Sequence, residues 1–246
     1  ASNQVSALVG AKAILTAYGR NGDGIYFYTG TLNDSDGTKK RSRIMTNQKG
    51  ILIGAFNNNN LTAITASGSV SVGAAAAAAS TTVVSSTRVQ AKVNSGAQLN
   101  QRNKESVTSA SKVKVIAMDS TEVDTAAGGA QVSIAGAAGT IVVTYLTKTV
   151  EAVLQGTIYA PGGIEVLAVS DNNVFLASVS GSAALAGGAG SASVLYTSNT
   201  VSGSLGGTVQ SGTGAVTVSA VSRQYIFSDY HRWRSSGRWS SCQHYL

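Results

Sequence analysis

The chain has 246 residues, of which 43% are hydrophobic and only 12% are charged. This composition excludes an intrinsically disordered chain, because disorder goes with low hydrophobicity and high net charge. No apolar run approaches the roughly 18 residues of a membrane-spanning helix. The chain begins at Ala1 without an initiator methionine or a signal peptide, so we expect a processed chain or a fragment of a larger protein.

The net charge of +7 raises the question of a nucleic-acid partner. Four of the 18 basic residues lie in the last 24 positions, however, and one cluster remains elsewhere: Lys39, Lys40, Arg41 and Arg43. We interpret this cluster as a solvated turn, with a phosphate- or glycan-binding patch as the alternative. The charge distribution therefore predicts no nucleic-acid partner.

Residues 1–50 are expected to form an irregular β coil or an inserted loop. Leu8 to Tyr18 fits either a short helix or a pair of strands. Gly19 to Gly24 is a turn-rich loop, and Ile25 to Tyr28 has the β-branched and aromatic composition of a strand.

Residues 51–222 contain an internal repeat. The segment that begins at Val113 recurs at Ile164, 51 residues later, and again at Val216, 52 residues after that. A fourth copy begins at Ile51, 62 residues before Val113, with extra polar sequence at Asn100 to Ser106 in between. A repeat of this period is typical of a solenoid whose units bury their inner faces against one another.

Each repeat holds about six short segments in which apolar and polar residues alternate, separated by Gly, Ser, Asn or Asp. Alternation with a period of two predicts strands, and the polar breaks predict turns. The sequence therefore predicts an all-β fold, a parallel β-helix built from repeats of about 52 residues. Six strands suggest two three-sided coils in each repeat, with inward Val, Ile, Leu and Ala forming a thin core.

The tail, residues 223–246, departs from the repeat. The last 19 positions hold both Trp, both His and the only Cys of the chain. A shift of the reading frame by one nucleotide after Ser222 would explain this, because it converts Trp233 and Trp239 into the glycines that the repeat has there. We therefore expect an out-of-frame tail, in which Cys242 and His244 form no metal site, since zinc requires four ligands.

Residues that carry chemistry are scarce. Residues 1–227 contain no His, which removes the commonest general base. Two acidic pairs, Asp34 with Asp36 and Glu122 with Asp124, would point the same way on a strand, but surface turns explain them better than a carboxylate dyad. The calcium-binding nonapeptide of repetitive toxins is absent. The sequence predicts no catalytic, cofactor-binding or metal-binding residues, and hence no enzyme.

The repeats Val113 to Gly163 and Ile164 to Gly214 resemble those of the fusobacterial leukotoxins, which belong to the haemagglutinin-like exoproteins exported by two-partner secretion. The resemblance lies in the alternating repeat starts and in the Ser180-Gly181-Ser182 and Ala186 to Gly190 stretches, and it covers residues 50–222. It implies a protein secreted or held at the bacterial surface, a β-helical shaft, an outer-membrane two-partner transporter and a host leukocyte surface as target.

Two functions compete, and the resemblance favours the first. In the first, the chain is a fragment of a leukotoxin-like cytotoxin that acts on leukocytes. In the second, it is the shaft of a surface adhesin or haemagglutinin, because a β-helix serves both roles equally well.

Overall fold

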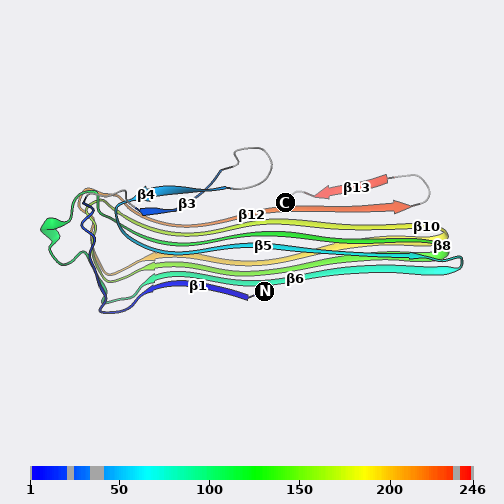
Figure 1. Cartoon of the computed structure of the whole chain (residues 1–246), viewed down its shortest axis with the longest axis horizontal. Coiled ribbons are helices and arrows are strands. Elements are labelled where there is room, and N and C mark those ends of the chain that lie inside the picture. Colours follow the sequence, from blue (N-terminus) through cyan, green and yellow to red (C-terminus); the bar gives the residue numbers. More distant parts are fainter. Residues whose placement is uncertain (1, 21–24, 34–41, 235–238, 245–246) are drawn as a thin grey trace.

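The computed structural model describes residues 2–20, 25–33, 42–234 and 239–244, with side chains over residues 2–20 and 48–228. Within these ranges the chain consists of strands, turns and one short 3-10 helix, η1 (Lys104–Ser106). Figure 1 shows the long strands running side by side along an elongated molecule. Because these strands pair in parallel from one repeat to the next, the predicted parallel β-helix is confirmed.

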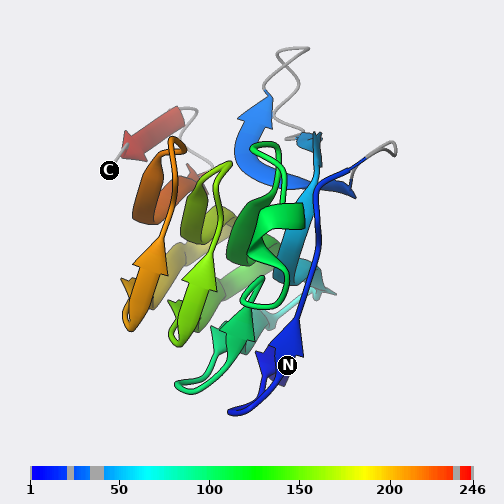
Figure 2. The same ribbon diagram turned by 90° about the vertical axis from the view of Figure 1, so that its left-hand side faces the viewer.

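Each coil has three walls, named here the outgoing, return and short walls. The chain follows the outgoing wall to a narrow tip, comes back along the return wall and crosses the short wall to the next coil (Figures 1 and 2). In the first full coil these long walls are β5 (Gly50–Val70) and β6 (Ala74–Val93). In the next two coils, β8 (Lys112–Leu154) and β10 (Ile164–Leu205) each form both long walls. The outgoing wall ends with β12 (Val216–Arg234).

The short wall is a four-stranded sheet of very short strands. These are β2 (Ile14–Leu15), β7 (Gln98–Leu99), β9 (Thr157–Tyr159) and β11 (Thr208–Gln210).

One repeat makes one coil. Val113 pairs with Ile164, and Ile164 with Val216, so the sequence period equals the register offset between neighbouring coils. The prediction of two coils in each repeat is therefore wrong. The extra polar sequence before Val113 is accommodated in the loop that contains η1, and this loop leaves the pairing of Ile51 with Val113 intact.

The polar breaks within the long walls do not turn the chain, so the turns predicted there are wrong, and backbone conformation shows which glycines do turn it. Among the described glycines, positive φ angles occur only where strands meet the short wall and its loops, as at Gly156 (115°) and Gly207 (89°). Glycines inside the long walls, such as Gly128 and Gly181, keep extended backbone and pair with the neighbouring coil. Composition alone does not distinguish a corner glycine from a strand glycine.

Residues 2–15 add part of another coil. β1 (Ser2–Val9) pairs in parallel with β6 on the return wall, and β2 pairs with β7 on the short wall. The helical alternative for Leu8 to Tyr18 is therefore wrong, because this segment satisfies its backbone groups against the neighbouring coil rather than locally.

An antiparallel hairpin of β3 (Ile25–Asn33) and β4 (Ser42–Gln48) follows, which confirms the predicted strand at Ile25 to Tyr28. Both ribbon views place this hairpin beyond the outgoing wall, on the side away from the return wall (Figures 1 and 2). Ile116 and Met118 point to that side and are fully buried. The acidic pair Asp34 and Asp36 and the cluster Lys39 to Arg41 lie outside the described residues.

The tail continues the outgoing wall. β12 pairs with β10 as far as Arg234, and β13 (Trp239–His244) folds back antiparallel on β12. Parallel pairing uses backbone groups, which every residue except proline supplies in full. The pairing therefore does not depend on the repeat sequence, and the out-of-frame origin of the tail stays a prediction.

The core narrows from the short wall to the tip. Near the short wall it holds Val, Ile and Leu side chains from all three walls. A second cluster, centred on Val123, Leu146 and Val174, follows between the two long walls. At the tip end the hydrophobic cluster consists of alanines, with Ala77, Ala138 and Ala189 stacked in register. The predicted thin core of Val, Ile, Leu and Ala is present.

Enlarging a side chain at the tip should therefore be costly. We expect Ala138→Leu to lower the free energy of unfolding by about 1–3 kcal/mol, since the added methylenes have no space between the walls. The neighbouring Ala137 is exposed, so Ala137→Leu should change stability by less than about 0.5 kcal/mol. Urea unfolding of both variants checks this, and equal midpoints would show that the walls are not closely packed at the tip.

Candidate functional site

The described part of the chain holds one buried ion pair in its core. On the outgoing wall, inward positions alternate through Val113, Val115 and Ala117 to Asp119, so the carboxylate takes the fourth inward position of its coil. Lys148 takes an inward position on the return wall of the same coil, directly across the core. The pair lies between the large core cluster at the short wall and the second cluster beyond it.

Neighbouring coils complete the site. Asn57 is the register partner of Asp119 on the outgoing wall, and Thr87 is the register partner of Lys148 on the return wall. Asn3 from β1 pairs in turn with Thr87. The site therefore draws on three successive coils, and its geometry depends on their stacking.

The carboxylate of Asp119 is the centre of the hydrogen-bond network. Its Oδ2 contacts the Nζ of Lys148 and accepts a hydrogen bond of 3.2 Å from the hydroxyl of Thr121. Its Oδ1 accepts a hydrogen bond of 2.6 Å from Nδ2 of Asn57. Asp119 is 0% exposed and Lys148 is 1% exposed, so neither group is in contact with bulk solvent.

The oxygen of the Asn57 carboxamide also has a partner. Nδ2 of Asn3 donates to Oδ1 of Asn57 at 2.6 Å, and to Oδ1 of Asn59 at 3.2 Å. Asn59 donates to the hydroxyl of Thr87 at 3.3 Å. The Asn57 carboxamide is therefore held on both sides, its nitrogen by a carboxylate and its oxygen by an amide donor.

Burial lowers the pKa of Lys148, because a charged ammonium loses its hydration in the core. The charge of Asp119, its hydrogen bond and the charge of Asp171 oppose this shift. The loss of hydration outweighs these opposing effects, so Lys148 adopts the neutral amine form more easily than an exposed lysine does.

The cluster is not a feature of every repeat. The register partners of Asp119 in the next two coils are Ser170 and Ser222, and the partner of Lys148 is Asn199. The same inward positions are thus polar in the following coils, whereas the charged pair occurs in one coil of the described chain. The comparable Ser170 hydroxyl is buried without a hydrogen-bond partner in the structure.

Comparison of the chain with protein-family models, curated proteins and solved structures finds no match. The assignment of a function therefore rests on the repeats and on the geometry.

Those acidic residues singled out in the sequence that the structure describes do not gather into a site. Glu122 and Asp124 lie within β8, on the outer face of the outgoing wall, so the surface turn predicted for this pair is wrong. Glu151 accepts a hydrogen bond from Gln90 at 2.6 Å, and Glu165 forms an ion pair with Lys114. In the described ranges no group of three or more His, Cys, Asp and Glu could hold a metal ion.

Cys242 and His244 belong to β13, and their side chains lie outside the described residues. In the ranges that the structure does describe, no helix has the length and apolar character needed to cross a membrane.

The sequence analysis missed the buried cluster, although a signal was present. Asn57, Asp119 and Lys148 all fall on the inward phase of their strands, where the preceding inward residues are Ala55, Ala117 and Leu146. A lysine in the apolar phase of a strand predicts a paired buried charge. Its partners could not be predicted, because they depend on how the coils stack.

Proposed function

We propose that the chain is a section of the shaft of a secreted bacterial surface protein or exotoxin, and that it acts through structure and binding. The observation that carries this proposal is the in-register stacking of whole coils. β10 pairs with β8 along both long walls and with β12 along the outgoing wall. Added repeats would therefore lengthen the molecule without changing its cross-section, which suits a shaft.

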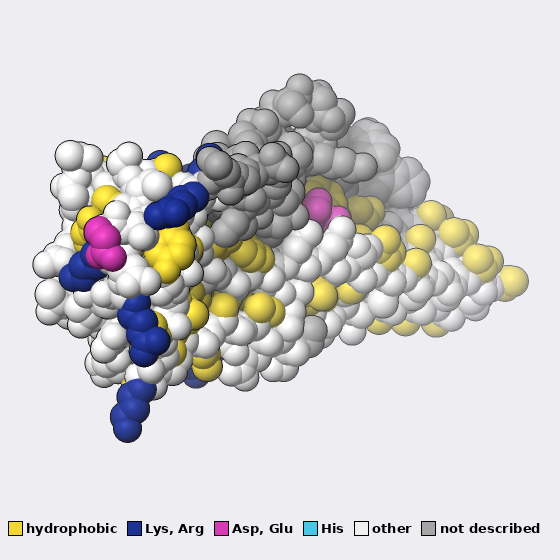
Figure 3. All heavy atoms as spheres, turned by 60° about the vertical axis from the view of Figure 1, so that its left-hand side comes forward, with side chains coloured by type: hydrophobic (Ala, Val, Ile, Leu, Met, Phe, Trp, Pro, Cys, Tyr) yellow, Lys and Arg dark blue, Asp and Glu magenta, His cyan; other side chains and the backbone are white. Residues whose placement is uncertain are grey.

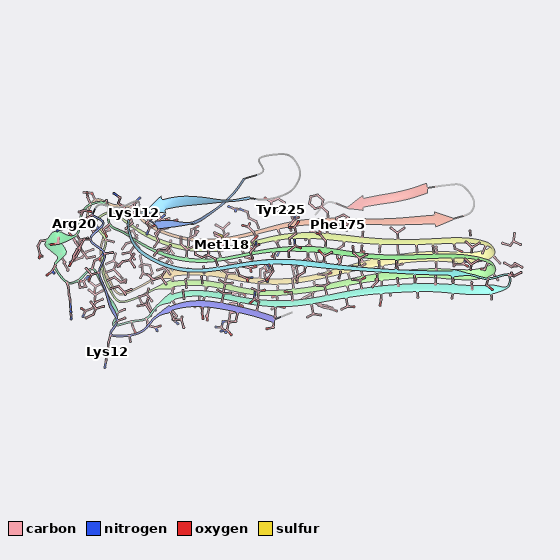
Figure 4. All side chains as sticks on the ribbon, in the orientation of Figure 1. Lys12, Arg20, Lys112, Met118, Phe175 and Tyr225 are labelled. Carbon is pink, nitrogen blue, oxygen red and sulfur yellow. The ribbon has the colours of Figure 1, made fainter. Side chains whose placement is uncertain are left out.

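The distribution of charge also supports a shaft. Lys and Arg side chains gather at the short-wall end, while the visible flank of the long walls is mostly uncharged (Figure 3). Lys12, Arg20 and Lys112 lie at this end (Figure 4). Of these, Arg20 lies over the ring of Tyr18 at 5.5 Å. If the chain binds an acidic ligand, we expect the ligand to contact this basic end rather than the long walls.

We propose a non-enzymatic role for two reasons. The acidic side chains described on the surface are dispersed, and Glu151 and Glu165 are each engaged by a neighbouring side chain. The polar cluster in the core is closed to a diffusing substrate, because Asp119 and Lys148 have almost no exposed surface.

Within this class we propose a leukotoxin-like cytotoxin that acts on host leukocytes and is exported by a two-partner transporter. This part of the proposal rests on the resemblance of the repeats at Val113 and Ile164 to those of the leukotoxins. It is tested by adding the purified chain to neutrophils and to erythrocytes and measuring both binding and viability. Loss of neutrophil viability at low dose supports the cytotoxin, and absence of any effect or binding contradicts it.

An exposed apolar strip favours an adhesin shaft as the second candidate. The strip lies on the outer face of the return wall and consists of Val84, Ile141, Tyr145, Val194 and Tyr196, each about half exposed. The rings of Tyr145 and Tyr196 lie 5.9 Å apart. A row of exposed apolar side chains on neighbouring strands is typical of a contact surface.

The two candidates make different predictions for the strip. If the chain is an adhesin shaft, Ile141→Asn combined with Tyr196→Asn should reduce cell binding at least tenfold, with viability unchanged throughout. Thr147→Asn lies on the same outer face and serves as the control. Binding unchanged by the double substitution would show that the strip is not the contact surface.

A further inference from the structure

The buried cluster contains the three groups that are needed to form an amide bond between side chains. Lys148 supplies an amine, Asn57 supplies a carboxamide with a leaving nitrogen, and Asp119 supplies an acid–base group. All three are buried, so water does not compete as a nucleophile and proton transfers stay within the cluster.

The contacts of Asp119 suit it to move a proton between the other two groups. One carboxylate oxygen contacts Nζ of Lys148, and the other is 2.6 Å from Nδ2 of Asn57. A proton transfer within the ion pair gives a neutral amine and a neutral acid. Both are the forms required for attack on a carboxamide, because an ammonium has no free electron pair.

Asn3 provides the third requirement, which is stabilisation of negative charge. Its Nδ2 donates to Oδ1 of Asn57 at 2.6 Å. This oxygen gains negative charge when a nucleophile adds to the carbonyl carbon. A donor fixed on it at this partly buried position lowers the energy of the tetrahedral intermediate.

We propose that Lys148 and Asn57 react spontaneously in the folded chain to form an intramolecular isopeptide bond. The Nζ of neutral Lys148 attacks Cγ of Asn57, so an Nζ–Cγ bond forms and the Cγ–Nδ2 bond breaks. The ammonium of Lys148 gives up two protons in all, and both pass through Asp119 to Nδ2, which leaves as an ammonium ion. Asp119 ends in the state in which it began, and the step needs neither an oxidant nor a reductant.

Asn57 is a better acyl donor than Asp119 for two reasons. If Asp119 were acylated, its oxygen would have to leave as water, and no second acid contacts it in the described network to supply the proton. The carboxylate form of Asp119 is also a poor electrophile, because its charge opposes attack. The Asn57 carbonyl is neutral and already polarised by Asn3.

The bond would join two coils across the core. Asn57 lies on the outgoing wall of one coil, and Lys148 lies on the return wall of the next. Hydrogen bonds between coils would then be reinforced by a covalent link that does not depend on the redox state. Such a link suits a shaft, although the chemistry does not depend on the proposed function.

Intact-mass spectrometry of the purified full chain tests this proposal. We expect a mass lower than that of the sequence by about 17 Da, which is the mass of one ammonia molecule. Fragmentation of a protease digest should identify a branched peptide that joins Lys148 to Asn57. A folded chain with the full sequence mass would overturn the proposal, as would a loss of about 18 Da with Lys148 joined to Asp119.

Variants distinguish the roles of the reacting groups, Lys148 and Asn57, from that of Asp119, which transfers the protons. Asp119→Asn keeps the size of the side chain and both reactants, so it should restore the full mass while circular dichroism still shows a folded chain. Lys148→Met should also restore the full mass. The control is Asn172→Ala, which changes another buried amide of the outgoing wall and should keep the loss of ammonia. Bond formation in a folded Asp119→Asn variant would overturn the role of Asp119.

Discussion

Replacing Asp119 with alanine should lower the free energy of unfolding by about 3–5 kcal/mol, because it leaves the amine of Lys148 buried without its carboxylate. The hydrogen bonds that Asn57 and Thr121 donate to this carboxylate are lost as well. The same substitution removes the group that we propose for the Lys148–Asn57 reaction, which acts in the same direction. The measurement is the midpoint and slope of urea unfolding.

A second ion pair of the same sheet provides the control. Lys114 and Glu165 pair across neighbouring coils, but their side chains are 16% and 31% exposed. Solvent screens this pair, so Glu165→Ala should cost less than about 1 kcal/mol. Similar losses for the two alanine variants would mean that Asp119 and Lys148 are hydrated, which would contradict a closed core.

Replacing Gly156 with alanine should be almost as damaging. Gly156 turns the chain between the return and short walls with a φ of 115°, which side chains with a Cβ rarely adopt. An added Cβ would also lie 2.4 Å from the carbonyl oxygen of Ala97 in the neighbouring coil. Strain of this kind costs about 1–3 kcal/mol before the clash is counted, so we expect a total of about 3 kcal/mol or more.

Gly181 offers a matched control for this corner. It lies within the outgoing part of β10, has no positive φ, and an added Cβ would contact nothing within 4 Å. Gly181→Ala should be neutral or slightly stabilising, since alanine restricts the unfolded chain. Thermal unfolding of the two variants checks the pair of expectations. A neutral Gly156→Ala would show that the corner is not where the structure places it.

The fold could be predicted from the sequence because its two periods are both visible. The repeat of about 52 residues indicates a solenoid, and alternation of apolar residues indicates strands with one face inward. The number of coils in each repeat could not be predicted. That number depends on which glycines turn the chain, and residue type alone does not distinguish Gly156, which has a positive φ, from Gly128, which does not.

The candidate site could be predicted in part from the sequence. The inward phase of Lys148 follows from its alternation with Leu146 and Val150. Two further features depend on the length of the long walls and on where the chain turns at the tip. These are the position of Lys148 opposite Asp119 and the position of Asn57 beside Asp119. The spacing of 62 residues between Asn57 and Asp119 also depends on the loop around η1, which no pattern in the sequence fixes.

Disulfide trapping tests the stacking of one repeat in each coil most directly. Lys114 and Glu165 face outward on adjacent outgoing strands, at a separation of about 4.8 Å. With Cys242 replaced by serine, the Lys114→Cys and Glu165→Cys double variant should oxidise to an intramolecular disulfide, because this separation lies within the usual Cα range. Two coils in each repeat would instead bring Lys114 next to Gly139. A disulfide in the Lys114→Cys and Gly139→Cys variant, with none between positions 114 and 165, would contradict the account.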